Sequence, residues 1–592
     1  MYPRGGPFII LLPLVLACTL PPRSYGLDRR NDVVRNVDSK MEMPTYETLS
    51  SWQERRTQLR SQVRASASLF PPRTHTPLNP RYFGKIEEDG YTVETVALET
   101  MPGFWLGGNL YRPLDGLKKH PAILHPHGHW KKGRLEDIPL YSSPRLAANL
   151  AKQGFVVFAY DMVGYNDTRQ LPHDFGSAQE LLWGFNPLAV QTWDSIRVLD
   201  FLQSLPDVDA EKIGVTGASG GGTQAFVLTS VDDRVKAAAP VNMVSFIMQG
   251  GCVCESAPGL RIGTNNVEIV SLFAPKPLLI VSATGDWTKN VPKEEFPAVQ
   301  SVYKLFGQPQ NVEVVQIDAP HNYNRESREA VYAFLNKTFY DRSAAPAETE
   351  VRIEPDEKML AWGSGDLPAD IQAQAKSHAG ILAWWQDEAR RAVASARRPQ
   401  LRYWLSRVLG VEWPAHVTTM EATNSLSRRG MGEHIPYQFI DGKGDPALYL
   451  DSKGIANALK SAKVQSWLKE KRPVLLIDAF QTATAREPRD EKDSKFLTYN
   501  VSDDAARVQD VLTALRWLSA RKHGRVEIDA VNSARWWAVF AAALSRTQVH
   551  FDFKPDEFKT TDDALITEFY VPGLQLVGGV NTAMELVSDL RR

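Results

Sequence analysis

Three residues that could form a nucleophilic serine site follow one another along the chain. Ser219 lies in the run Gly217-Ala218-Ser219-Gly220-Gly221, and Asp286 and His321 each follow a later apolar stretch. A serine hydroxyl attacks a carbonyl group only when a histidine takes its proton and a carboxylate orients that histidine. This order predicts Ser219 as nucleophile, His321 as base and Asp286 as orienting acid.

The glycines around Ser219 indicate how it is presented. Residues 213–216 have the composition of a buried strand and residues 222–229 that of a helix, so the G-x-S-x-G run falls on a strand-to-helix turn. Such a turn is so tight that its neighbours must lack side chains, and it places the hydroxyl at a helix N-terminus. A turn that binds phosphate or only closes the packing is the alternative interpretation.

The identity of the acid stays open in the sequence. Ser219, Asp286 and His321 are predicted at the tips of three successive strands, which favours Asp286. Asp318 is the rival carboxylate, and Glu255 and Glu268 are remoter ones.

The run His125-Pro126-His127-Gly128-His129-Trp130 follows another predicted strand. Backbone N–H groups of Gly128 or His129, together with that of Gly220, are expected to stabilise a developing oxyanion. Trp130 and Trp287 lie beside the predicted catalytic loops. Their aromatic faces suit packing on a sugar ring, and packing in the core explains them equally well.

A zinc site is the alternative interpretation of these histidines. The alternating histidines His125, His127 and His129 could ligate zinc, but no H-E-x-x-H or paired C-x-x-C motif supplies further ligands at a recognisable spacing. Cys252 and Cys254 could be a ligand pair or a strained local disulfide, but so short a spacing favours plain loop residues. We therefore expect no metal and no other cofactor.

The elements that must position these residues alternate along the chain. Residues 91–98, 105–111 and 155–160 are predicted strands, and residues 187–205 a helix. This alternation predicts an α/β fold with a mostly parallel sheet, helices on both faces and a site at the carboxyl ends of the strands. An amphipathic helix is expected between residues 44 and 70.

Residues 85–342 resemble α/β hydrolases of the secreted dienelactone-hydrolase and acetyl-xylan-esterase type. The resemblance rests on His127-Gly128, the turn at Ser219, Asp286 and His321, and on stretches at 251–268 and 274–288 that are similar to exported bacterial carbohydrate esterases. It implies an α/β-hydrolase fold and ester hydrolysis through a serine acyl-enzyme without a cofactor. Acetyl or methyl esters on polysaccharide are the expected substrates.

Two other functions were considered. The elbow and the order of the triad also suit a prolyl-oligopeptidase-like serine peptidase, but fewer than about 90 residues precede the hydrolase strands, too few for a propeller. A catalytically inert glycan-binding protein is the other alternative.

The chain restarts with helical patterns after residue 346, where we place a domain boundary. Asp510, Leu515 and Leu518 repeat the spacing of Asp194, Leu199 and Leu202, so residues 346–592 are expected to be a second α/β domain. In that alignment Ala534 stands opposite Ser219, which predicts a degenerate, silent hydrolase domain. An unrelated α/β domain is the alternative.

Composition and the N-terminus limit the remaining possibilities. The 592 residues are 43% hydrophobic and 23% charged with a net charge of -1, which disfavours nucleic acid as a partner. Residues 1–26 are expected to be a signal peptide, with Cys18 as a possible lipidation site, followed by a helical extension at 27–84 and the catalytic domain at 85–345. No apolar run spans a membrane, and the oligomeric state stays open.

Overall fold

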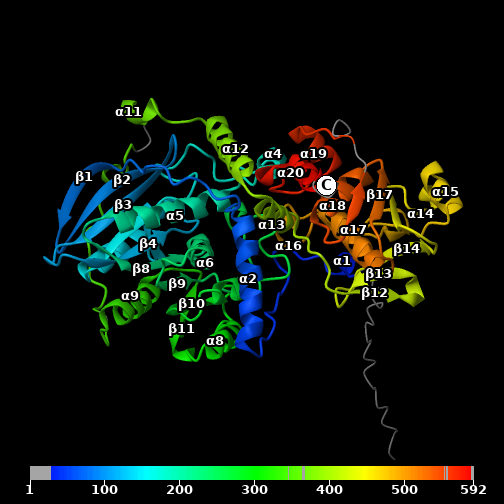
Figure 1. The fold of residues 1–592 in the computed structure, drawn as a ribbon. Coiled ribbons are helices and arrows are strands. Elements are labelled where there is room, and N and C mark those ends of the chain that lie inside the picture. The colour runs from blue at the N-terminus through cyan, green and yellow to red at the C-terminus, as the bar shows by residue number, and fades with distance from the viewer. Residues whose placement is uncertain (1–27, 345, 363–366, 552–553, 555–557, 589–592) are drawn as a thin grey trace, which may run out of the picture.

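The computed structural model describes residues 28–344, 346–362, 367–551, 554 and 558–588. The predicted signal peptide and Cys18 lie outside the described residues. Two sheets, each with its own helices, form two lobes that meet around α2 (Leu49–Ser66), α12 (His378–Ser395) and α13 (Arg398–Leu409) (Figure 1). Among the described helices, none is long and apolar enough to cross a membrane.

The first lobe contains a nine-stranded sheet in the order β1-β2-β3-β7-β4-β8-β9-β10-β11. Its strands are β1 (Arg81–Glu88), β2 (Tyr91–Met101), β3 (Phe104–Pro113), β4 (His120–Pro126), β7 (Val156–Tyr160), β8 (Val208–Ala218), β9 (Ala237–Val241), β10 (Leu278–Gly285) and β11 (Val312–Pro320). The pairs from β7 to β11 are parallel, and β1, β2, β3 and β7 pair antiparallel. The predicted mostly parallel α/β fold is confirmed.

Two details differ from the sequence expectation. The sheet begins at Arg81, within the segment expected to be a helical extension. The strand β9 lies between β8 and β10, so the strands that end at Ser219 and Asp286 are not adjacent. This strand, Ala-Ala-Ala-Pro-Val, is short and alanine-rich, and it lacks the β-branched composition that identifies a strand.

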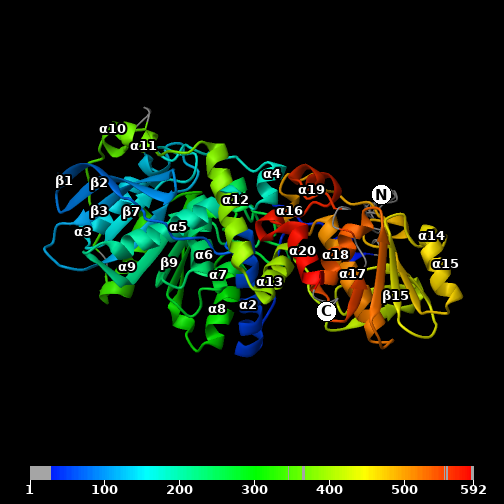
Figure 2. The ribbon, with the colours of Figure 1, turned by 45° about the horizontal axis from the view of Figure 1, so that its top comes forward.

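Helices cover both faces of this sheet (Figure 2). The helices α5 (Pro187–Ser204), α6 (Gly220–Val231) and α8 (Glu295–Leu305) share one hydrophobic core, and α2 packs into it. The helices α3 (Ser143–Lys152) and α9 (Arg325–Tyr340) share the core on the other face. Burial on both faces explains why the central strands are almost wholly apolar.

The second lobe repeats the strand order of the first. Its strands are β12 (Val417–Met420), β13 (Ser425–Arg428), β14 (Ile435–Ile440), β15 (Ala447–Asp451), β16 (Val474–Ile477), β17 (Val526–Val531) and β18 (Val549–Phe551), in the order β12-β13-β14-β16-β15-β17-β18. This order matches β1-β2-β3-β7-β4-β8-β9 position by position, with the same parallel and antiparallel pairs. Within the described residues it has no counterpart of β10 and β11.

The turn in the second lobe differs from the alignment of the two sequences. Asn532, with φ of 57°, is the residue of left-handed conformation after β17, and Ala534 begins α18 (Ala534–Leu544). The strand therefore reaches its turn two residues sooner than an ungapped alignment of Ala534 with Ser219 requires. The helix before it, α17 (Asp503–Ser519), occupies the place of α5.

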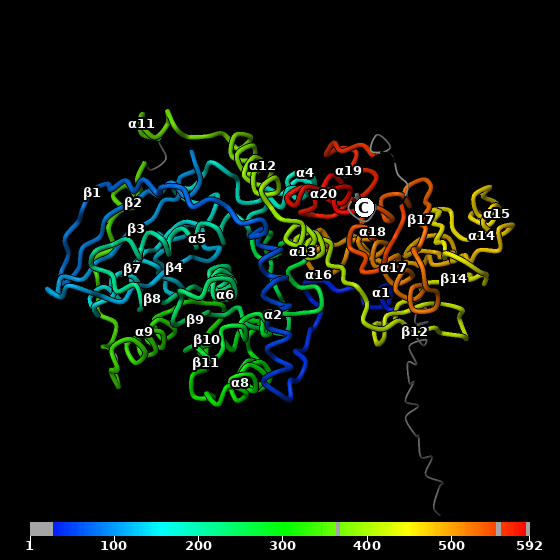
Figure 3. Tube along the Cα trace, in the orientation of Figure 1, coloured from blue at the N-terminus to red at the C-terminus, as the bar shows by residue number. Residues whose placement is uncertain are grey.

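Segments distant in the sequence join the two lobes (Figure 3). The α12 helix packs into the first core and α13 into the second. Arg30, near the N-terminus, pairs with buried Asp510 of the second lobe at 2.7 Å. Backbone N–H groups of Gly259 and Arg261 donate to the carbonyl groups of Leu497 and Thr498 at 2.8 and 2.9 Å. The second lobe therefore holds a loop of the first lobe in place.

Candidate active site

Ser219 occupies a strained turn between β8 and α6. Its φ of 58° and ψ of −125° place a non-glycine residue in a region that L-amino acids rarely adopt. A Cβ at Gly217 would lie 2.5 Å from the carbonyl oxygen of Pro126, and one at Gly221 would lie 2.2 Å from it. The end of β4 thus approaches the turn so closely that only glycine fits on either side of Ser219.

His321 and Asp286 lie together at the ends of β11 and β10. Nδ1 of His321 donates to Oδ2 of Asp286 over 2.8 Å. The other oxygen of Asp286 accepts hydrogen bonds from the backbone N–H and the hydroxyl group of Thr288 at 2.7 and 2.5 Å. Since Nδ1 carries the proton, a neutral His321 has its lone pair on Nε2, which is buried and has no acceptor or donor among the described residues.

The rival carboxylates all have other partners. Asp318 accepts a hydrogen bond from the hydroxyl group of Thr284. Glu255 accepts from the backbone N–H groups of Gly251 and Cys252, and Glu268 pairs with Arg55 on α2 at 2.7 Å. Asp286 is therefore the carboxylate that the structure places on His321.

The loop after β4 packs against this turn. A Cβ at Gly128 would lie 2.6 Å from the carbonyl oxygen of Ala218, and one at Gly220 would lie 2.6 Å from the His129 ring. Nδ1 of His127 donates to the carbonyl oxygen of Gly128 over 2.7 Å. In a trans peptide the N–H group opposes the carbonyl group, so this bond sets the direction of the His129 N–H. Gly220 is the first residue of α6, and its N–H has no intrahelical acceptor.

His125 and His127 have structural roles. His127 also accepts a hydrogen bond from the Met162 N–H on Nε2 at 2.9 Å, and Nδ1 of His125 donates to the carbonyl oxygen of Thr216 at 2.9 Å. Burial lowers the pKa of His125 to about 4 and that of His127 to about 3. Both are neutral at physiological pH and fix the strand end and the loop.

The two tryptophans contact the ring of His321. The Trp130 ring lies parallel to the His321 ring, with 5.7 Å between centroids, and stacks on Tyr141 at 3.8 Å. The Trp287 ring is tilted by 36° to His321 at 4.5 Å. Both tryptophan side chains are half-buried. Their ring contacts are with Tyr141 and His321.

The sequence interpretation missed His173 and the cluster that it completes. His129, His173, Cys252 and Cys254 converge, with their ligand atoms all within 4.8 Å of one another. His173 lies in the loop after β7, and the two cysteines lie in the loop after β9. His173 lies 44 residues after His129 and 79 residues before Cys252. Neither spacing matches a known metal-ligand motif, so the sequence gives no signal for His173 as a ligand.

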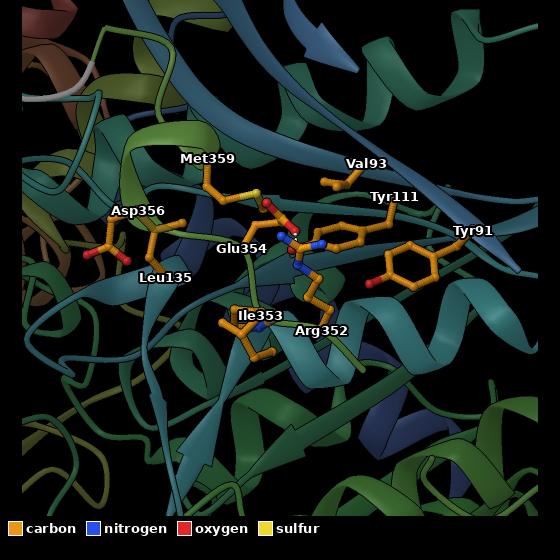
Figure 4. A pocket seen from close by; sticks show the side chains of 10 residues that line it. Tyr91, Val93, Tyr111, Leu135, Arg352, Ile353, Glu354, Asp356 and Met359 are labelled. Carbon is orange, nitrogen blue, oxygen red and sulfur yellow. Dashed lines mark ion pairs between the residues drawn. The ribbon is translucent and has the colours of Figure 1, made fainter. Parts of the chain in front are cut away.

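A small pocket elsewhere in the first lobe contains none of these residues. It lies between Tyr91 and Val93 of β2, Tyr111 of β3 and the segment 352–359, where Arg352 and Glu354 form an ion pair at 2.7 Å (Figure 4). It forms where the segment after α9 packs over β2 and β3.

Comparisons with known proteins agree with this fold. The model of the dienelactone hydrolase family matches residues 141–245, and that of the BAAT / acyl-CoA thioester hydrolase C-terminal family matches residues 197–301. The chain is 27% identical over 237 residues to "Putative hydrolase YtaP" of Bacillus subtilis (strain 168), which covers 37% of this chain and 78% of that protein.

Among solved structures, the methylesterase BT1017 is 31% identical, with a TM-score of 0.49, over 60% of this chain and 78% of the other. A glucuronoyl esterase from Solibacter usitatus is 17% identical, with a TM-score of 0.39, over 52% of this chain and 98% of the other.

The fold and the arrangement at Ser219 define a member of the α/β-hydrolase superfamily. Within that superfamily the matched segments relate the chain to the dienelactone hydrolases. The chain is a serine ester hydrolase.

Proposed function

We propose that the chain hydrolyses carboxylic esters through Ser219, His321 and Asp286, and that it removes acetyl or methyl ester groups from polysaccharide. The observation that carries the catalytic part is the pairing of His321 with Asp286 at 2.8 Å, on the same sheet edge as the strained turn at Ser219.

In the proposed mechanism Nε2 of His321 takes the proton of the Ser219 hydroxyl as Oγ attacks the ester carbonyl carbon. The oxyanion accepts hydrogen bonds from the backbone N–H groups of His129 and Gly220, and one such donor contributes about 3 to 4 kcal/mol. The backbone N–H of Gly128 is the alternative donor from the same loop. Protonated His321 then donates to the leaving alcohol oxygen, and water repeats the sequence on the acyl-enzyme.

The proposed substrate class is supported by the aromatic side chains beside His321. The half-buried rings of Trp130 and Trp287 beside His321 provide an apolar rim, which suits a sugar bearing a small ester group. Export from the cell is proposed from the sequence pattern of residues 1–26 alone.

We also propose that the second lobe is catalytically silent. Its described residues include no strands equivalent to β10 and β11, which carry Asp286 and His321 in the first lobe. Among the described residues, Ser533 at its turn therefore lacks the strand-borne counterparts of Asp286 and His321.

Labelling with a fluorophosphonate probe tests the mechanism. We expect an adduct on Ser219 that is absent in Ser219→Ala and His321→Ala, whereas Ser533→Ala, the matched control in the second lobe, labels like wild type.

Release of acetate and methanol from acetylated xylan and methyl-esterified pectin tests the substrate class. Preferential hydrolysis of aminoacyl-anilides would favour the serine peptidase alternative. Polysaccharide binding without labelling by the probe would favour the inert glycan-binding alternative.

A further inference from the structure

We propose that His129, His173, Cys252 and Cys254 bind one zinc ion as a closed structural site. Nε2 of His129 lies 3.2 Å from Nε2 of His173 and 3.1 Å from Sγ of Cys254, and Sγ of Cys252 lies 3.3 Å from Nε2 of His173. A tetrahedral zinc ion bound to nitrogen and sulfur requires separations of about 3.3 Å between two nitrogens and about 3.6 Å between nitrogen and sulfur. The four side chains are already close to that geometry.

The protonation of His173 favours a metal over hydrogen bonds within the cluster. Nδ1 of His173 donates to the carbonyl oxygen of Val163 at 2.6 Å, so the neutral ring has one lone pair, on Nε2. His129 Nε2 and Cys252 Sγ both approach that single lone pair, at 3.2 and 3.3 Å, as a second and third ligand of one metal ion would. A cation between them satisfies all the groups, and the bond to Val163 is the support that metal-bound histidines usually have.

The surroundings hold the ligands in place. The backbone N–H groups of Gly251 and Cys252 donate to Glu255, whose other oxygen accepts from the Thr223 hydroxyl group of α6 at 3.0 Å. A Cβ at Gly164 would lie 2.5 Å from the backbone nitrogen of His173, so the loop after β7 is folded tightly against this histidine. Cys254 is fully buried and the other three ligands are half-buried.

The site lies beside the catalytic turn and has no place for substrate on the metal. Four protein ligands complete a tetrahedral zinc ion, and two thiolates neutralise its charge, which is typical of a structural site. His129 joins the cluster to the oxyanion loop, and Glu255 joins it to the nucleophile helix. The four residues are therefore positioning residues that fix the His129 N–H relative to Ser219.

Metal analysis of the full chain, purified without chelator, tests the proposal. We expect one zinc per chain in wild type, in catalytically dead Ser219→Ala and in the exposed-histidine control His523→Ala. Cys252→Ser, Cys254→Ser and His173→Ala are expected to lose it. Because Ser219→Ala keeps the metal, failure of this proposal is distinguishable from failure of the proposed function.

A second measurement uses only the wild-type chain, so it tests the proposal even if the ligand variants fail to fold. After replacement of zinc by cobalt we expect thiolate-to-cobalt charge-transfer absorption and the intense visible bands of a tetrahedral ion. A chain that takes up no zinc on reconstitution, bound cobalt without thiolate bands, or a Cys252–Cys254 disulfide found by peptide mass mapping would each overturn the proposal.

Discussion

The rings of Trp130 and His321 are parallel to within 2°, with their centroids 5.7 Å apart. Trp130 comes from the oxyanion loop after β4 and His321 from the end of β11, so this contact links two parts of the site that lie on different strands. The contact raises two possible roles for Trp130: it could support the His321 ring, or it could contact the substrate.

Replacement of Trp130 by leucine distinguishes these roles. If the ring supports His321, kcat for p-nitrophenyl acetate falls about tenfold, a loss of about 1.4 kcal/mol in the transition state, while KM changes little. Steady-state kinetics on this small ester and on a polysaccharide ester measure the difference. A rise in KM for the polymer alone would instead assign Trp130 to sugar binding; Trp413→Leu in the second lobe serves as control.

Removal of the charge on Asp286 tests the triad. In Asp286→Asn the side chain can donate to Nδ1 and stabilise the wrong tautomer of His321, so kcat is expected to fall about 10⁴-fold with the fold intact. Asp318→Asn, which alters the neighbouring rival carboxylate, is expected to change kcat by less than about twofold. Equal losses in the two variants would contradict the assignment.

The glycine after the turn has a steric role that can be measured. Gly221→Ala places a Cβ 2.2 Å from the carbonyl oxygen of Pro126, so we expect a loss of about 3 kcal/mol in unfolding free energy or a displaced β4 loop. Urea unfolding and esterase activity report the two outcomes. Gly380→Ala in α12 is the control, with an expected change below about 1 kcal/mol. Unchanged stability and activity in Gly221→Ala would show that β4 does not limit the turn.

The free energy of unfolding is expected to fall in acid because His125 of β4 is buried. The pKa of His125 is lowered from 6.5 to about 4 by burial. Between these values the unfolded chain binds a proton that the folded chain does not, so stability falls as the pH drops from about 6.5 to about 4 and levels off below. At pH 5 this group costs about 2 kcal/mol relative to pH 7.5.

His125→Asn removes this titration and retains a donor for the carbonyl group of Thr216. Urea unfolding at pH 7.5 and pH 5 is therefore expected to show a loss on acidification that is about 2 kcal/mol smaller than in wild type. The exposed-histidine variant His523→Asn should behave like wild type. An identical loss in His125→Asn and wild type would mean that His125 is charged in the folded state.

The second lobe is expected to control the loop that carries the cysteines. The hydroxyl group of Thr498 donates to the carbonyl oxygen of Ser256, and Thr498→Val removes this buried bond at a cost of about 1 kcal/mol. Hydrogen exchange in residues 251–261 should accelerate. Thr513→Val, which removes a buried bond within α17, should leave that exchange unchanged; equal exchange in both variants would show that the loop is held from within the first lobe.

Much of the catalytic site could be predicted from local patterns. The turn at Ser219 needs glycines because of contacts within a few ångströms, and strand tips at Asp286 and His321 follow from apolar stretches that end in polar residues. The strand β9 was missed because its alanines carry too little β-branched character, and the choice between Asp286 and Asp318 was open because both flank strand ends.

The second lobe shows the limit of comparing the two halves by sequence. Matching residues in α5 and α17 indicated a repeat, but counting on from them with a one-residue shorter connection placed Ala534 opposite Ser219. The structure repeats the strand order and shortens β17, so Asn532 takes the left-handed position at the turn. The order and direction of the strands therefore match between the two lobes even where the residues at the turn differ.

The sequence alone therefore determined the class of fold and predicted Ser219 and His321 as candidate site residues, because these depend on turn geometry and on strand periodicity that neighbouring residues encode. Only the tertiary structure decided which carboxylate reaches His321 and that His173 joins His129, Cys252 and Cys254. Those contacts form between loops after β4, β7, β9, β10 and β11, and their distances depend on how the strands are ordered in the sheet, which no local pattern contains.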